Sequence, residues 1–165
     1  MASTNLKTTH VFTLRATLEL GQTVGQTLSG IRIFVPVSGG TLKGPDIEAE
    51  ILPVGGGDWL SLNPDQGHAR LDVRLIARTS QNELLYAYYP GHLPFTPNIG
   101  AIAGGDKEAK STGFDDTGLL TQITIETGSE RLAWMNKGTF VGKGRFLVGE
   151  GSGVATVEYD VFKIE

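Results

Sequence analysis

Apolar and polar side chains alternate along most of this 165-residue chain, and a period of two is that of a β-strand. In residues 10–20, apolar side chains occupy the even positions from Phe12 to Leu20, and polar ones occupy the odd positions between them. No segment keeps a helical period for more than about one turn. The sequence therefore predicts an all-β protein with little or no helix.

The alternating segments are separated by turn-forming residues at short intervals, which is typical of a barrel or a sandwich. We expect a single domain over residues 1–165, with a tail at 1–8, a turn at Gly39–Gly40 and a long loop at 92–116 over one barrel mouth. A single antiparallel β-barrel of about eight to ten strands is favoured, because closure removes exposed sheet edges. The strands expected beside the charged segment 68–78 are 10–20, 31–37, 42–52, 84–89, 119–127, 131–136, 139–148 and, closing the barrel, 154–164.

The composition excludes several classes of site. The chain has 23 glycines, which suits many turns and bulges, and it has no cysteine, so it forms no disulfide and has no thiolate metal ligand or cysteine nucleophile. A net charge of −4 without a long basic run argues against nucleic-acid binding. No apolar run approaches the roughly 20 residues of a membrane helix, and the first residues lack the pattern of a signal peptide. A cytoplasmic protein without a membrane contact is expected.

Five short motifs, taken in order, resemble a known family. They are GQTLSG at 25–30, SGGTLKGP at 38–45, GGGDW at 55–59, LDVR at 71–74 and RLAWMN at 131–136. Together they resemble DUF3237, also named UPF0311, a family of unknown function. The resemblance implies a barrel of the calycin or allene-oxide-cyclase kind, and it implies a link to secondary metabolism in some members.

The strand after the turn at 63–67 has one charged and one apolar face. Arg70, Asp72 and Arg74 share the first face, and Leu71 and its alternate neighbours share the second. Facing water, the charged stripe would be ordinary surface. Facing the inside of a closed sheet, it would be a binding or catalytic site. The sequence leaves both orientations open.

Two carboxylates combined with two guanidinium groups can poise one group as an acid or base while another stabilises charge. Together with the resemblance, this predicts an internal catalytic site formed by Asp58, Asp72, Arg74 and Arg32. Asp58 or Asp72 would move a proton, and Arg74 or Arg32 would stabilise an oxyanion or enolate. A structural ion-pair network, or charges on the outer wall, are the alternatives.

Aromatic side chains in the same region would shape a flat or polycyclic apolar ligand, or would simply fill the core. Asn136 would share a strand face with Trp134 and could donate to a carbonyl group. The expected substrate-binding residues are Trp59, Tyr86, Tyr88, Trp134, Asn136 and Phe140.

These observations favour an enzyme without a cofactor that acts on a small, largely apolar metabolite by cyclisation, isomerisation or elimination, as an isomerase, cyclase or lyase. A non-catalytic carrier with the same cavity is the alternative, and a filled barrel that serves as a structural or oligomerising module is a third. No metal is expected, because His10, His68 and His92 lack a ligand spacing. A small molecule is the expected partner, and the barrel is compatible with a homo-oligomer.

Overall fold

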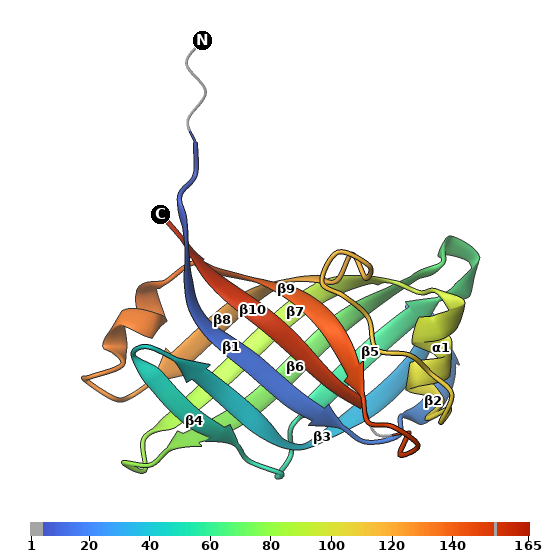
Figure 1. Ribbon diagram of the computed structural model, residues 1–165, viewed down its shortest axis with the longest axis horizontal. Coiled ribbons are helices and arrows are strands. Elements are labelled where there is room, and N and C mark those ends of the chain that lie inside the picture. Colours follow the sequence, from blue (N-terminus) through green and yellow to red (C-terminus); the bar gives the residue numbers. More distant parts are fainter. Residues whose placement is uncertain (1–4, 154) are drawn as a thin grey trace.

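The computed structural model describes residues 5–153 and 155–165, and its strands form a single sheet that closes into a barrel (Figure 1). The strand pairs of the described residues are antiparallel, which confirms the expected antiparallel barrel. The strands are β1 (Thr8–Leu18), β2 (Gln22–Thr27), β3 (Gly30–Gly44), β4 (Ile47–Ile51), β5 (Gly57–Asn63), β6 (His68–Thr79), β7 (Leu84–Pro94), β8 (Leu120–Thr127), β9 (Phe140–Val148) and β10 (Ala155–Ile164).

The closed wall has eight strand positions. Its order is β1, β10, β9, β8, β7, β6, then β5 and β4 in one shared position, and finally β3, which pairs with β1 again. β5 bridges the first half of β3 to β6, and β4 bridges the second half of β3 to the end of β6. β2 continues past β1 along the free edge of β3. The closing role expected of the last strand is confirmed for the described residues 155–164, while Val154 lies outside them.

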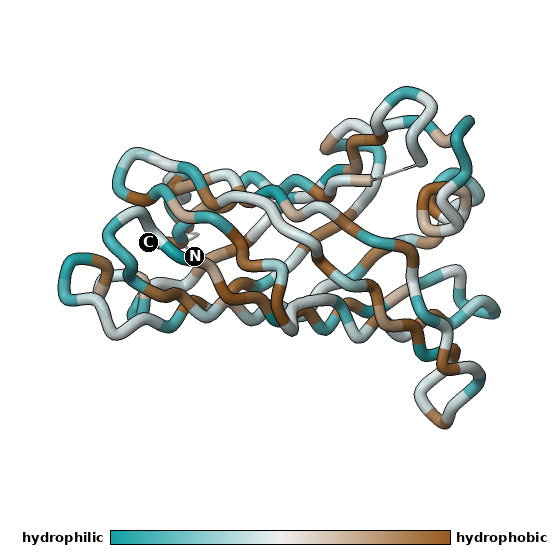
Figure 2. Tube along the Cα trace, turned by 90° about the horizontal axis from the view of Figure 1, so that it is seen from below, coloured by the Kyte–Doolittle hydropathy of each residue, from teal (hydrophilic) through white to brown (hydrophobic). Residues whose placement is uncertain are grey.

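The alternation decides which side chains are inside. Phe12, Leu14 and Ala16 of β1 are fully buried, and the odd-numbered residues Leu71 to Ala77 of β6 are buried as well. Figure 2 shows the same alternation as brown and teal segments that follow one another along the strands. The apolar faces of the strands that form the closed wall therefore line the barrel interior, as the hydrophobic effect requires.

Gly40 lets β1 and β3 approach closely enough to close the barrel. Its φ is +139°, and a Cβ atom there would lie 2.0 Å from the carbonyl oxygen of Arg15. The turn expected at Gly39–Gly40 is wrong, because β3 runs through both glycines and only bends there. The glycine pair is used for close backbone approach, which the sequence does not distinguish from a turn.

Two further expectations about elements are corrected. The segment expected as a strand at 131–136 overlaps the 3₁₀ helix η2 (Ala133–Lys137), since Leu132 and Met135, three residues apart, are the buried side chains. The segment expected as a loop at 92–116 contains the end of β7 and helix α1 (Pro97–Ala103). The polar strand β2 was not expected either, and neither was β5.

The two ends of the barrel differ (Figure 1). Helix α1 lies at one end, where Thr96 caps it by accepting a hydrogen bond from the backbone N–H of Ile99 at 3.3 Å. The 3₁₀ helix η2 lies at the other end and packs beside β8. A third short helix, η1 (Pro64–Gln66), links β5 to β6. No helix in the described residues has the length and hydrophobicity needed to span a membrane.

Barrel closure predicts an unequal effect of two glycine substitutions. Gly40→Ala should lower the free energy of unfolding by about 3 kcal/mol, because it adds a backbone clash to an unfavourable φ. Gly25→Ala is the matched control: its φ is +117° but nothing lies within 4 Å of the added Cβ, so the loss should be about 1 kcal/mol. Chemical denaturation of both variants measures the difference, and equal losses would mean that close approach at Gly40 is unimportant.

Candidate functional site

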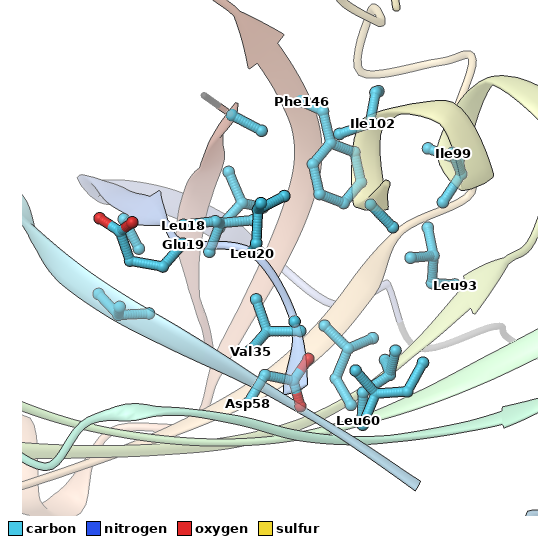
Figure 3. Close-up of a pocket in the computed structure, with 18 of the residues that line it drawn as sticks. Leu18, Glu19, Leu20, Val35, Asp58, Leu60, Leu93, Ile99, Ile102 and Phe146 are labelled. Carbon is cyan, nitrogen blue, oxygen red and sulfur yellow. The ribbon is translucent and has the colours of Figure 1, made fainter. Parts of the chain in front are cut away.

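The barrel holds an internal cavity of about 380 Å³ at the α1 end. Its wall is mainly aliphatic, and α1 contributes Ile99 and Ile102 beside the ends of β1, β7 and β9 (Figure 3). The segment from Leu18 to Gly21 and the glycines Gly105 and Gly153 form the rest of the mouth. Asp58 of β5, Tyr89 of β7 and Tyr159 of β10 interrupt the apolar lining, and Glu19, Thr23 and Ser152 are its other polar side chains.

Asp58 is the buried carboxyl group of this cavity. It points inward from the start of β5 between Val35 and Leu60, and it is only 8% exposed (Figure 3). Its Oδ1 atom accepts a hydrogen bond of 2.8 Å from the backbone N–H of Asp72 on β6. No hydrogen-bond partner is recorded for Oδ2 among the described residues. One oxygen is therefore fixed by the wall, and the other is available to the cavity.

Burial shifts the proton equilibrium of Asp58. Removal from water raises the pKa of this carboxyl from 3.8 to about 7, and the nearby charge of Asp72 acts in the same direction. The hydrogen bond from the Asp72 backbone and the positive charge of Arg32 oppose the rise. The result is a carboxyl group that is populated in both protonation states near neutral pH.

The glycine before Asp58 explains how the carboxyl reaches the interior. A Cβ atom at Gly57 would lie 2.6 Å from both the Phe34 ring and the carbonyl oxygen of Val35. Only glycine therefore lets β5 pair this closely with β3 at the position where β5 begins. The three-glycine run before Asp58 thus ends in the glycine that β5 needs where it begins to pair with β3.

Tyr89 and Tyr159 face each other across the interior. Both are essentially fully buried, and their rings make an edge-to-face contact with centroids 5.5 Å apart. Burial raises the pKa of both phenols, and the negative charge of Asp58 raises them further. The Tyr159 Oη atom is buried without a hydrogen-bond partner in the described part of the chain. Gly142 and Gly144 of β9 leave room for its ring, since a Cβ at Gly144 would lie 2.6 Å from it.

The structure places the charged stripe of β6 on the outer wall. Arg70 and Arg74 are exposed, and the side chain of Asp72 is 38% exposed, whereas Leu71 and Val73 are buried. The interior position expected for Asp72 and Arg74 is thus wrong, because the apolar face of the same strand takes the interior. Arg32 also points outward, next to the inward residues of β3. Of the four expected catalytic residues, only Asp58 reaches the cavity.

Several of the expected aromatic residues belong to this outer wall as well. The Arg74 guanidinium forms an ion pair of 2.9 Å with Asp72 and lies over the rings of Trp59 and Tyr88, at 5.8 and 5.1 Å. Trp59 packs on Phe34, with ring centroids 4.8 Å apart, and the Arg32 Nη1 atom donates to its carbonyl oxygen.

Tyr86 has the same outward parity as Tyr88 and borders a shallow hollow away from the cavity. The cluster of Arg74 with its aromatic neighbours lies on the outside of the barrel. These expected ligand contacts therefore do not line the cavity.

The remaining expected residues lie at the η2 end. Phe140 is fully buried and packs edge-on against Trp134, with centroids 6.0 Å apart. The Asn136 amide caps the end of β8, because its Oδ1 accepts from the backbone N–H of Thr127 at 2.8 Å and its Nδ2 donates to the carbonyl of the same residue at 2.9 Å. None of these three residues lines the cavity, and their contacts hold together the η2 end of the barrel.

Tyr89, Tyr159 and helix α1 were not expected from the sequence. A signal for the tyrosines was present: Tyr89 continues the inward positions Leu85 and Ala87, and Tyr159 continues those of Ala155 and Val157. Tyr86 and Tyr88, the two tyrosines of segment 84–89 that were expected to bind substrate, lie on the outward face of the strand. No three His, Asp or Glu side chains within residues 5–153 and 155–165 lie close enough to hold a metal ion.

These features define a closed β-barrel whose apolar cavity contains the buried carboxyl group of Asp58. The chain belongs to the family described as "Protein of unknown function (DUF3237)", whose model matches residues 6–164. A UPF0311 protein of Rhodopseudomonas palustris is 25% identical over 139 residues, which cover 83% of this chain and 86% of that protein. Its crystal structure, described as a conserved protein of unknown function, has a TM-score of 0.80 at 23% identity and covers 99% of this chain and all of the other.

Two fungal proteins are also similar. The PR-toxin biosynthesis cluster protein 7 of Penicillium roqueforti is 26% identical over an alignment of 170 positions, covering 93% of this chain and 90% of that protein. The crystal structure of an enzyme from Penicillium herquei has a TM-score of 0.67 at 16% identity and covers 100% of this chain and 98% of the other. The second likeness concerns the fold alone.

The raised pKa of Asp58 predicts how stability depends on pH. Between its unfolded value of 3.8 and its folded value of about 7, the folded state binds the proton and the unfolded state does not, so stability falls as pH rises through this window. The loss is on the order of 4 kcal/mol over the whole window. Asp58→Asn should remove most of this pH dependence. As pH rises from about 5 to 8, its free energy of unfolding should therefore increase by on the order of 3 kcal/mol relative to that of the wild type.

Urea denaturation at both pH values measures this gain. Asp65→Asn, at an exposed position of η1, is the control and should keep the wild-type pH slope. An Asp58→Asn variant with the wild-type slope would mean that the carboxyl is ionised and well solvated at neutral pH.

The outer position of Asp72 predicts a small effect for Asp72→Asn. The ion pair with Arg74 is half exposed, so its loss should change the free energy of unfolding by less than about 1 kcal/mol. The backbone N–H that Asp58 needs remains in the variant. A thermal melt several degrees below that of the wild type would show that this pair supports the wall more strongly than its exposure implies.

Proposed function

We propose that this chain is a β-barrel enzyme that acts without a cofactor on a small, largely apolar metabolite, by acid/base catalysis in the internal cavity. The reaction would be a cyclisation, an isomerisation or an elimination. One observation carries the proposal: the carboxyl group of Asp58 is almost fully buried, faces an apolar cavity and has a pKa of about 7.

A group with this pKa suits both directions of proton transfer at neutral pH. In a cyclisation, protonated Asp58 would give its proton to one carbon of a double bond while a hydroxyl of the same molecule attacks the other carbon. The proton released from that hydroxyl would return to the Asp58 carboxylate, so that no atom is gained or lost. Oδ2 is the oxygen that would exchange the proton, because Oδ1 is held by the backbone of Asp72.

The cavity supports this use of Asp58. Its volume of about 380 Å³ lies in the range of small-molecule sites, and its aliphatic lining would exclude water from the reacting atoms. Tyr159 also lines the cavity, and its hydroxyl, which has no acceptor in the described part of the chain, would be a neutral hydrogen-bond donor to a developing negative charge. Arg32 and Asp72 would act on Asp58 only through the wall, by their charges.

One relative supports a role in secondary metabolism, because it carries the name of a toxin biosynthesis cluster. A cytoplasmic location and assembly into a homo-oligomer stay predictions.

A non-catalytic carrier with the same cavity is the second candidate. The observation in its favour is that Asp58 is the single carboxyl group deep in a lining that is otherwise mainly apolar. Glu19, the other acidic residue of the lining, lies at the mouth. A carrier would bind and release the same molecule, whereas an enzyme would convert it.

Incubation with a small-molecule extract of the protein's own host, followed by mass spectrometry, separates the two candidates. The enzyme should consume one compound and form another of equal mass and different retention time, or one lighter by a water molecule. Asp58→Asn should slow this conversion about 100-fold or more, because a positioned acid or base contributes that much. Tyr88→Phe on the outer wall is the matched control and should convert at the wild-type rate.

Each other outcome has a defined meaning. A compound that is captured in native mass spectrometry and released unchanged supports the carrier. Val35→Phe, which fills the space beside Asp58, should abolish capture or conversion in either case. Conversion that persists in both Asp58→Asn and Val35→Phe would overturn the internal site.

A further inference from the structure

Resting on the proposed cavity site, we propose that its ligand is an uncharged molecule, largely hydrocarbon, that presents a single hydroxyl group to Asp58 and Tyr159. Carboxylates, phosphates and ammonium compounds would be rejected. Phenols and alcohols of mono- or bicyclic size are the chemical class that fits.

The unpartnered Tyr159 hydroxyl is the first observation. Tyr159 is among the residues that line the cavity, and its buried Oη atom finds no acceptor in the described part of the chain. Buried hydroxyl groups nearly always have a partner, and an unsatisfied one in a cavity wall points to a ligand that supplies it. The ligand must therefore carry an oxygen or nitrogen that accepts a hydrogen bond.

The free oxygen of Asp58 is the second observation. Oδ1 is occupied by the Asp72 backbone, and Oδ2 is left for the cavity. A hydroxyl group can donate to this carboxyl and accept from Tyr159 at the same time, because one oxygen carries both a proton and lone pairs. An ammonium group has no lone pair for Tyr159, and an ether has no proton for the carboxylate.

The absence of cationic groups from the lining excludes anions. The cavity is lined by no lysine, arginine or histidine among the described residues, and the nearest arginine on this wall, Arg32, points outward. A carboxylate or phosphate would lose its hydration without a counter-charge and would meet the negative charge of Asp58. Most of the other lining residues, such as Val35 and Phe146, are apolar and match the hydrocarbon part of the ligand.

Three probes with one bicyclic skeleton test the inference: 2-naphthol, naphthalene and 2-naphthoate. In fluorescence or calorimetric titrations at neutral pH, 2-naphthol should bind about ten-fold more tightly than naphthalene, as one or two added hydrogen bonds imply. The carboxylate should bind at least about 100-fold more weakly than 2-naphthol. Tyr159→Phe should weaken 2-naphthol about five-fold and leave naphthalene unchanged. Its stability should equal that of the wild type or exceed it, since the lost hydroxyl has no partner.

The controls separate failure of this inference from failure of the proposed site. Tyr88→Phe on the outer wall should change neither affinity, and Val35→Phe should weaken both neutral probes. Equal affinity of naphthalene and 2-naphthol, with both lost in Val35→Phe, would overturn the hydroxyl requirement and leave the cavity as the binding site. Tight binding of 2-naphthoate would overturn the exclusion of anions. Neutral probes that fail to bind, or that bind equally well in Val35→Phe, would overturn the proposed site itself.

Discussion

The closure of the sheet between β1 and β3 is the constraint on which the other features depend. An open sheet of the same strands would leave one face wet, and Asp58 would then be an ordinary solvated carboxylate. Gly40 permits the closing contact, because its missing Cβ leaves room for the Arg15 carbonyl. Closure converts an alternating sequence into an apolar interior, and the raised pKa of Asp58 follows from that interior.

The barrel wall gives two neighbouring carboxyl groups opposite properties. Asp58 and Asp72 lie on adjacent strands and are joined by a 2.8 Å hydrogen bond, yet one side chain points inward and the other outward. Outside, Asp72 has water and Arg74 to stabilise its charge. Inside, the hydrogen bond from one backbone N–H only partly offsets the loss of hydration of the Asp58 carboxylate. The side of the barrel wall that each side chain faces therefore decides which carboxyl could serve as an acid. Both residues are part of short motifs with aromatic or arginine neighbours, so the motifs alone do not distinguish them.

The sequence predicted the barrel well and the site poorly, for physical reasons. Period-two alternation directly reports a two-faced strand, and so β1, β6 and β10 were predicted close to their true bounds. β2 is polar on both faces because it lies beyond the closed wall, and so carried no such signal. The charged stripe on β6 was interpreted as a site, but burying the apolar face of the strand is more favourable, so the charged face lies outside. Tyr159 was overlooked because an inward tyrosine among valines resembles plain core until its hydroxyl is found without a partner.

The two ends of the barrel have different packing, and this sets the direction in which a ligand would enter. At the η2 end, Phe140 packs against Phe12 and Trp134, and these rings fill the interior. At the α1 end, the interior is hollow, and its cover is a seven-residue helix with two inward isoleucines. A ligand would thus enter past α1 and meet Asp58 and the tyrosines with its leading end. Since the rest of the lining is mainly apolar, the site would select a molecule by the chemistry of its leading end and by the overall length and apolarity of the remainder.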